Sequence, residues 1–251
     1  MPKRDHQPIV TGQRAGGNFL FLVDHASPLV PDELEGLGLP ASELQRHIGW
    51  DIGAADLARG LADALASPAV YAPVSRLVVD PNREPDDAEV IPPVSDGTVI
   101  PANKGLDEAG RRRRIARCHE PFHDAAGKLV GEMMAGGREP FVVGIHSFTP
   151  SMNGGAPRPW HIGVMWNEDR RLSEPLVSHL KDEGFTVGEN EPYSGRAPKN
   201  VFYTMMRHGA GNGLPHTQIE VRQDLLAEAD GIKAWVGILS GALRRMEAVV
   251  G

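Results

Sequence analysis

The stretch Asn18–Val23, NFLFLV, contains a continuous apolar run, Phe19–Val23, that ends directly before Asp24-His25. A short uninterrupted run of large apolar side chains predicts a buried strand. A second run of this kind, Phe141–Ile145, is followed by His146. Because open α/β sheets place their chemistry at strand ends, we expect both histidines to lie at the functional edge of one sheet.

The remaining chain alternates between strand and helix patterns and shows no internal repeat. Further strands are predicted at residues 69–72, 77–79, 162–166, 186–188 and 217–222, and helices at residues 51–66, 106–134, 172–183 and 232–249. The irregular segment Asp86–Lys104 is longer than most loops of compact domains, so we expect it to border a functional site. No linker divides the chain, which indicates one domain over residues 1–251. This order predicts an α/β protein, with three α/β/α layers around a mixed sheet.

Composition argues against nucleic acid and membranes as partners. The chain has 26 Lys and Arg against 33 Asp and Glu, a formal charge of −7, so an anionic partner would need a local cluster of arginines. Residues 1–18 lack the apolar core of a signal peptide, and no stretch approaches the ~20 apolar residues of a membrane span. A single cysteine excludes an internal disulfide. We expect a soluble, cytoplasmic protein, and the sequence predicts no oligomeric state.

Three residues of metal-ligand type stand beside apolar segments: His25, Asp51 and His146. Two imidazoles and one carboxylate, with a fourth position open to water, are typical of a catalytic zinc site. Each has a structural alternative. Either histidine could form only local hydrogen bonds, and Asp51, in the first turn of the predicted helix, could cap it or face its dipole. Their joint placement at two strand ends and one helix start favours a metallohydrolase.

A fourth candidate lies late in the chain, where Thr217–Arg222 alternates between polar and apolar residues. On a strand this alternation puts Gln218, Glu220 and Arg222 on one face. Glu220, as a carboxylate separate from the metal ligands, could act as a general base. Arg222 could bind a substrate carboxylate or form an ion pair that orients Glu220, and both interpretations stay open.

The segment His119–His123, HEPFH, matches the H-E-x-x-H signature of zinc proteases. That signature needs both histidines on one face of a continuous helix. Pro121 lacks an N–H and its ring clashes with the carbonyl of Arg117, which costs about 3 kcal/mol inside a helix. Proline also disfavours helical dihedral angles at Glu120. We therefore expect the helix to be interrupted here and the motif not to bind metal.

Two other features favour structural roles. The run Arg111–Arg114 points around most of a helix, which indicates a solvated surface with pairing to nearby acids rather than a nucleic-acid patch. Cys118 is interpreted as a buried structural residue, with a catalytic thiol as the less favoured alternative.

Five segments, taken in chain order, resemble motifs of the N-formylglutamate amidohydrolase family. They are residues 24–27 (DHAS), 50–54 (WDIGA), 75–83 (SRLVVDPNR), 121–123 (PFH) and 145–147 (IHS). The resemblance extends over roughly residues 19–224. It implies kinship with zinc carboxypeptidases, and hence a phosphorylase/hydrolase-like α/β/α fold with one catalytic zinc.

The resemblance also implies a role for individual residues. His25, Asp51 and His146 would be the zinc ligands, Glu220 the general base, and Asn82-Arg83 the pair that binds a substrate carboxylate. Arg76 and Arg83 are candidates to stabilise the oxyanion. The carboxypeptidase pattern places its acidic ligand three residues after the first histidine. Pro28 occupies that position here and cannot ligate, so Asp51 replaces it, with His47 and Asp24 in reserve.

By this resemblance the chain is a zinc-dependent amidohydrolase that removes a small N-acyl group, formyl, from an acidic amino acid such as glutamate. Its expected partner is a small-molecule N-acyl amino acid. One alternative is the same chemistry on other N-acyl amino acids or short peptides. The other is a homologue without turnover that only binds a metal or ligand.

Overall fold

The structure, a computed structural model, describes residues 6–12, 16–196 and 201–250. Within these residues, seven strands form one mixed sheet in the order β1-β3-β2-β6-β9-β7-β8. The strands are β1 (Ile9–Thr11), β2 (Phe19–Val23), β3 (Ala69–Tyr71), β6 (Phe141–Phe148), β7 (Ile162–Met165), β8 (Val187–Glu189) and β9 (His216–Arg222). The helices are α1 (Ala41–Leu44), α2 (Ala54–Ala64), α3 (Glu108–Arg114), α4 (Glu120–Ala135), α5 (Ser173–Asp182), α6 (Tyr203–His208) and α7 (Ala229–Val250).

The centre of the sheet consists of parallel strands. β2 pairs in parallel with β3 and β6, and β6 pairs in parallel with β9, whereas β7 runs antiparallel to β9 and β1 antiparallel to β3. In the β6–β9 register, His146 lies opposite Glu220. The two apolar runs that predicted buried strands are fully buried in β2 and β6.

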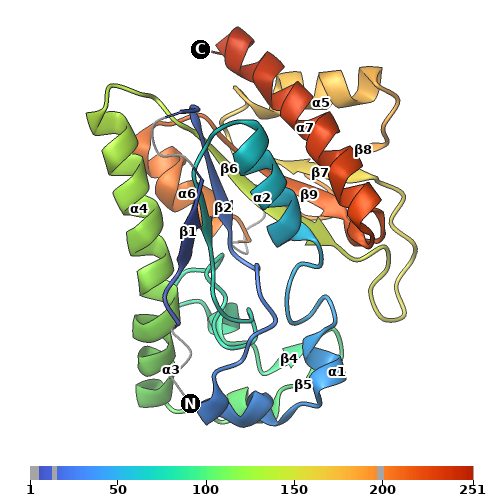
Figure 1. Cartoon of the computed structure of the whole chain (residues 1–251). Coiled ribbons are helices and arrows are strands. Elements are labelled where there is room, and N and C mark those ends of the chain that lie inside the picture. Colours follow the sequence, from blue (N-terminus) through green and yellow to red (C-terminus); the bar gives the residue numbers. More distant parts are fainter. Residues whose placement is uncertain (1–5, 13–15, 197–200, 251) are drawn as a thin grey trace.

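Helices cover both faces of the sheet, so the predicted three-layer α/β/α architecture is confirmed (Figure 1). The side chains of β2 alternate between the two interfaces. Phe19, Phe21 and Val23 belong to the core under α2, α5 and α7, and Leu20 and Leu22 belong to the core under α4 and α6. The β2 run is apolar throughout because both of its faces are packed against helices.

A third hydrophobic core lies beyond the strand ends, where α1 and the hairpin of β4 (Val94–Ser95) and β5 (Thr98–Val99) gather (Figure 1). The strand predicted at residues 77–79 is wrong. Leu77, Val78 and Val79 are buried in this third core, but their backbone forms a turn without a ladder partner. An apolar run indicates that its residues are buried, and here they are buried in a core formed largely by loops rather than in a sheet.

The predicted interruption at Pro121 is also wrong. A π-helical turn, Ile115–His119, joins α3 directly to α4, and Glu120 keeps helical dihedral angles of φ −57° and ψ −47°. Pro121 therefore stands in the first turn of α4, where a missing N–H costs little because the wide turn has already displaced the regular hydrogen bonds. Among the described residues, no helix combines the length and apolarity needed to span a membrane.

Candidate active site

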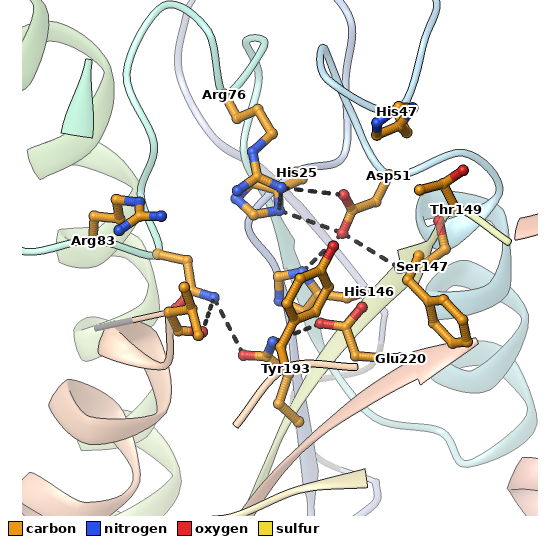
Figure 2. Close-up of a pocket in the computed structure, with 14 residues that line it drawn as sticks. His25, His47, Asp51, Arg76, Arg83, His146, Ser147, Thr149, Tyr193 and Glu220 are labelled. Atoms are coloured by element: carbon orange, nitrogen blue, oxygen red, sulfur yellow. Dashed lines mark hydrogen bonds and ion pairs between the residues drawn. The ribbon is translucent and has the colours of Figure 1, made fainter. Parts of the chain in front are cut away.

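A pocket opens at the carboxyl ends of β2, β6 and β9, the place predicted for function in an open α/β sheet (Figure 2). It is lined by His25, His47, Asp51, Arg76, Asn82, Arg83, His146, Ser147, Phe148, Thr149, Tyr193, Val201, Gln218 and Glu220. His25 follows β2, and His146 and Glu220 extend from neighbouring positions of β6 and β9. The structure thus brings together most of the residues that the sequence analysis singled out.

Asp51 lies in a turn before α2 and not in the first turn of the helix, as the sequence had indicated. The N-cap of α2 is Gly53, with a φ of +80° and no side-chain capping bond. A Cβ at Gly53 would lie 2.5 Å from the Cβ of Leu226, so the turn requires glycine. The Asp51 backbone N–H donates to the carbonyl of His25 at 2.9 Å, which fixes the acid beside the end of β2. The side chain of Asp51 therefore does not cap α2, which was the structural role considered for it.

His25, Asp51 and His146 converge on one point. Oδ2 of Asp51 lies 3.3 Å from Nδ1 of His25 and 2.8 Å from Nδ1 of His146, as the dashed lines of Figure 2 mark. One donor atom from each residue lies within 4.8 Å of the others, and all three side chains are buried. Two imidazole nitrogens and a carboxylate oxygen in this arrangement are suited to hold a zinc-like cation.

A carboxylate lies behind each of the two histidines. Nε2 of His25 is 2.7 Å from Oδ1 of Asp80, and Nε2 of His146 is 3.0 Å from Oδ2 of Asp24. Thr204 donates its hydroxyl to the other Asp24 oxygen at 2.6 Å. A carboxylate that accepts the Nε2–H leaves the Nδ1 lone pair free for a cation. Asp24, held in reserve as a ligand, instead contacts the ring of His146, a candidate ligand.

The protonation states of His25, Asp51 and His146 depend on one another. Burial lowers the pKa of His146, but hydrogen bonds to Asp24 and Asp51 more than offset it, so the pKa is well above the ordinary value. The pKa of His25 is also raised, since the pull of Asp80 and Asp51 exceeds the effects of burial and of Arg76. The pKa of Asp51 is lowered, because His25 and His146 outweigh its burial. A cation that binds here must therefore displace protons from the histidines.

Arg76 points its guanidinium at the same group (Figure 2). Its Nη2 donates to Oδ2 of Asp80 at 2.8 Å, and its Nη1 lies 3.1 Å from Nδ1 of His25 and 3.7 Å from Oδ1 of Asp51. Although burial lowers the pKa of Arg76, Asp80 and Asp51 raise it overall. A permanent cation thus lies at the edge of the donor group, where an oxyanion could be stabilised.

Glu220 is a buried carboxylate that faces the pocket beside His146. Its Oε1 accepts a hydrogen bond from Nε2 of Gln218 at 2.9 Å, so Gln218 and Glu220 share one face of β9 as predicted. Burial raises the pKa of Glu220, and His146 only partly opposes this. A carboxylate with a raised pKa in a cleft is typical of a general acid or base.

Asn82 and Arg83 differ in how many side-chain hydrogen-bond donors remain available to a ligand. Asn82 donates both amide hydrogens, to the carbonyl of Val201 at 3.0 Å and to Oε1 of Gln218 at 3.2 Å, so its side chain has no donor left for a substrate carboxylate. Among the described residues, Arg83 makes long contacts only, 3.4 Å to Asp87 and 3.8 Å from Nε to Asp80. Its guanidinium retains most of its donors.

Arg222 is not brought to the pocket. Its guanidinium pairs with both carboxylate oxygens of Asp224, at 2.8 and 3.2 Å, and with the carbonyl of Trp160. It forms neither the carboxylate clamp nor the Glu220 ion pair considered from sequence, because β9 ends at Arg222 and the chain turns away there. His47, the other reserve ligand, lies at the pocket wall with Nε2 3.1 Å from Asp96.

The histidines of the HEPFH motif contact backbone carbonyls and are not part of the donor group. The rings of His119 and His123 are adjacent, with centroids 4.6 Å apart, because the helix is continuous. Each Nε2 lies 2.9 Å from a backbone carbonyl, that of Arg83 or Pro81 respectively. Within the described residues, the group of side chains suited to hold a metal is His25, Asp51 and His146.

The carboxylates behind the histidines and the position of Tyr193 in the pocket were not predicted from the sequence. Asp24 and Asp80 stand inside the quoted motifs DHAS and SRLVVDPNR, which was a usable signal for acidic partners. Tyr193 lines the pocket from a segment without any recognisable pattern.

A three-layer α/β/α fold with a buried His-Asp-His group and a neighbouring carboxylate at the strand ends defines the protein as a hydrolase. The model of the N-formylglutamate amidohydrolase family matches residues 17–227, and the chain belongs to that family.

Two solved structures share the fold of the chain. Gene product Atu2144 from Agrobacterium tumefaciens is 34% identical and superimposes with a TM-score of 0.91, over 97% of this chain and 96% of that one. The fold also matches N-formylglutamate amidohydrolase from Ralstonia eutropha JMP134, at 19% identity and a TM-score of 0.70, over 97% and 98% of the two chains. No curated protein matches the chain.

Proposed function

We propose that the protein is a zinc-dependent amidohydrolase that releases formate from an N-formylated acidic amino acid, with glutamate as the first choice. The observation that carries this proposal is the buried His25-Asp51-His146 group beside Glu220, in a chain of the N-formylglutamate amidohydrolase family. We propose further that the whole chain forms one catalytic domain.

The donor set fits zinc. Its two imidazole nitrogens and one carboxylate oxygen leave a side open to the pocket, and Asp80 and Asp24 orient the rings. Zinc bound by these residues would lower the pKa of a water molecule toward ~7 and polarise the scissile carbonyl.

The residues around this point would carry the remaining steps. Glu220 accepts a proton from the attacking water and delivers it to the nitrogen of the leaving amine. Gln218 holds Oε1 of Glu220 through its 2.9 Å hydrogen bond. Arg76 offsets the negative charge that develops on the carbonyl oxygen. The C–N bond breaks, and formate and the free amino acid leave.

The preference for an acidic amino acid would come from Arg83. Because the chain carries a formal charge of −7, a dianionic substrate needs a local cation. Arg83 lines the pocket, and within the part of the chain that the structure describes most of its donors make no strong contact. A guanidinium can pair with a carboxylate through two parallel bonds.

The proposal is tested by measuring release of formate from N-formylglutamate and N-formylleucine, together with the zinc content of the purified protein. We expect about one zinc per chain and a higher kcat/KM for the glutamate derivative. Zinc without any formate release from either compound would reject the amidohydrolase proposal. A preference for the leucine derivative would reject only the acidic substrate.

The matched variants are Arg83→Ala and Arg83→Lys. Loss of a charge-assisted contact is worth about 1.5–3 kcal/mol, so Arg83→Ala should raise KM for N-formylglutamate by roughly 10- to 100-fold at constant zinc content. Arg83→Lys should recover part of the loss, because an ammonium is a point charge without the planar fork. An unchanged KM in Arg83→Ala would assign this cation to the structure alone.

A further inference from the structure

The turn that carries Arg83 is held at each of its three residues. The carbonyl of Pro81 accepts from Nε2 of His123, and the carbonyl of Arg83 accepts from Nε2 of His119, both at 2.9 Å. Between them, Oδ1 of Asn82 accepts from the backbone N–H of Thr204 at 3.1 Å. Such complete restraint of a loop segment is expected where a side chain must keep one position.

The hydrogen positions on the two histidines follow from their partners. A carbonyl oxygen can only accept, so Nε2 carries the hydrogen in both rings. Nδ1 of a neutral His123 is then an acceptor, and it receives the Nε2–H of His208 at 2.9 Å. Burial lowers the pKa of His123 to about 2 and of His208 to about 4, which agrees with neutral rings.

The same turn reaches the proposed base. Nδ2 of Asn82 donates to Oε1 of Gln218 at 3.2 Å, and Nε2 of Gln218 donates to Oε1 of Glu220 at 2.9 Å. A displacement of the turn would therefore disturb both the cation that faces the substrate and the hydrogen bond that orients Glu220.

We propose that His119 and His123 are positioning residues, whose Nε2–H groups hold the backbone of the 81–83 turn and thereby place Arg83 for a substrate carboxylate. This role of Arg83 rests on the proposed function. His119 ends the π-helical turn and His123 lies in α4, and this spacing of four residues puts both rings on one face of the continuous helix, as in a zinc protease. Here that face supplies two hydrogen-bond donors to two carbonyls of one turn instead of two ligands to one metal.

His119 gives the sharpest test, because its Nδ1 is buried without a hydrogen-bond partner in the described part of the chain. A substitution there removes only the hydrogen bond made by Nε2. Glutamine reaches about as far as histidine and keeps an Nε2–H, whereas methionine has a similar length and no donor. We expect His119→Met to raise KM for N-formylglutamate about five- to tenfold, with a smaller change in kcat, and His119→Gln to restore most of it.

A double-mutant cycle separates positioning from general destabilisation. If His119 acts through Arg83, His119→Met should change KM little in an Arg83→Ala background, since the group it places is gone. The control is His216→Met, which removes another buried donor to a backbone carbonyl, that of Leu214, away from the turn. This control should lower thermal stability comparably and leave KM unchanged.

Hydrogen exchange gives a readout independent of activity. The backbone N–H of Asn82 donates to Oδ1 of Asp80 at 2.9 Å, so a peptide spanning residues 80–84 reports the order of the turn. We expect this peptide to exchange about fivefold faster in His119→Met and at a rate near wild type in His119→Gln and His216→Met. That result supports the positioning contact even if N-formylglutamate is not a substrate. Unchanged exchange in His119→Met overturns the proposal, as do fully additive KM effects in an enzyme that cleaves N-formylglutamate.

Discussion

His25 and His146 form one pair of neighbouring buried histidines, and His119 and His123 form another that differs in what surrounds it. His25 and His146 have carboxylate oxygens near both ring nitrogens, supplied by Asp51 on one side and by Asp80 or Asp24 on the other. His119 and His123 instead donate to backbone carbonyls. The pKa is raised in the first pair and lowered, chiefly by burial, in the second.

This difference shows why a motif spacing alone is a weak sign of metal binding. The second pair has the sequence signature of a zinc protease and adjacent rings, yet among the described residues its Nε2 atoms contact backbone carbonyls and not carboxylates. The first pair is 121 residues apart in sequence and converges because β2 and β6 are neighbours. Negative charge around the imidazoles, rather than their spacing, distinguishes the site that suits a cation.

The largest effect should be seen in metal retention. His146→Ala removes one of three proposed protein ligands and should abolish zinc that survives gel filtration, whereas His123→Ala should retain about one zinc per chain. The measurement is metal analysis of both purified variants after the same mild chelation. Zinc loss in His123→Ala together with retention in His146→Ala would reverse the assignment of the two pairs.

The next largest effect should be on turnover. Glu220→Gln keeps nearly the same shape but cannot accept a proton, so kcat should fall by ~10²–10⁴-fold with zinc content unchanged. Steady-state formate release and metal analysis on the same preparation separate the two quantities. A kcat close to that of wild type would show that Glu220 is not the general base.

A smaller effect is expected from the carboxylates behind the ligands. Asp80→Asn should weaken zinc binding by roughly 10–100-fold, because the amide no longer attracts the Nε2–H of His25. Competition with a chelator of known affinity measures this loss. The matched control is Asp87→Asn on the same loop, which does not touch a proposed ligand and should leave zinc affinity as it is. Equal losses in both variants would contradict a specific role for Asp80.

Much of the fold was predictable from the sequence, because buried strands leave a plain signal. The apolar runs of β2 and β6 and the alternation of β9 marked the three strands that carry the pocket residues. The turn at residues 77–79 was mistaken for a strand, since burial in a loop core gives the same apolar signal. The continuity of the helix through Pro121 was also missed, because a π-turn has no sequence signature of its own.

The candidate site was predictable in its members and less so in their partners. His25, Asp51, His146 and Glu220 lie in one pocket, as the resemblance implied. The pairing of His25 with Asp80 joins residues 55 positions apart, and no local pattern encodes such a contact. Arg222 was placed on the correct strand, but its distance from the pocket depends on where β9 ends.

The smallest predicted effect concerns stability against pH in the metal-free protein. Burial lowers the pKa of His208 to about 4, below the ordinary value near 6.5. In the unfolded chain His208 gains a proton as pH falls below ~6.5, while the folded protein resists it. Its contribution to stability is therefore present above pH ~6.5 and is lost as pH falls toward ~4, by up to about 1.4 kcal/mol per pH unit. His146 has the opposite sign, because its pKa is raised: its contribution is present below pH ~6.5 and is lost as pH rises through the folded value.

Urea unfolding of the metal-free protein at several pH values tests this contrast. In His208→Gln, the unfolding free energy should fall less steeply than in wild type as the pH is lowered below ~6.5. In His146→Asn, it should fall less steeply as the pH is raised. The glutamine in His208→Gln keeps an N–H donor for His123, so the comparison isolates the proton and not the hydrogen bond. If both variants flatten the same side of the profile, His146 and His208 do not lie in opposite electrostatic environments, and the contrast between the donor group and the buried histidines beside α4 fails.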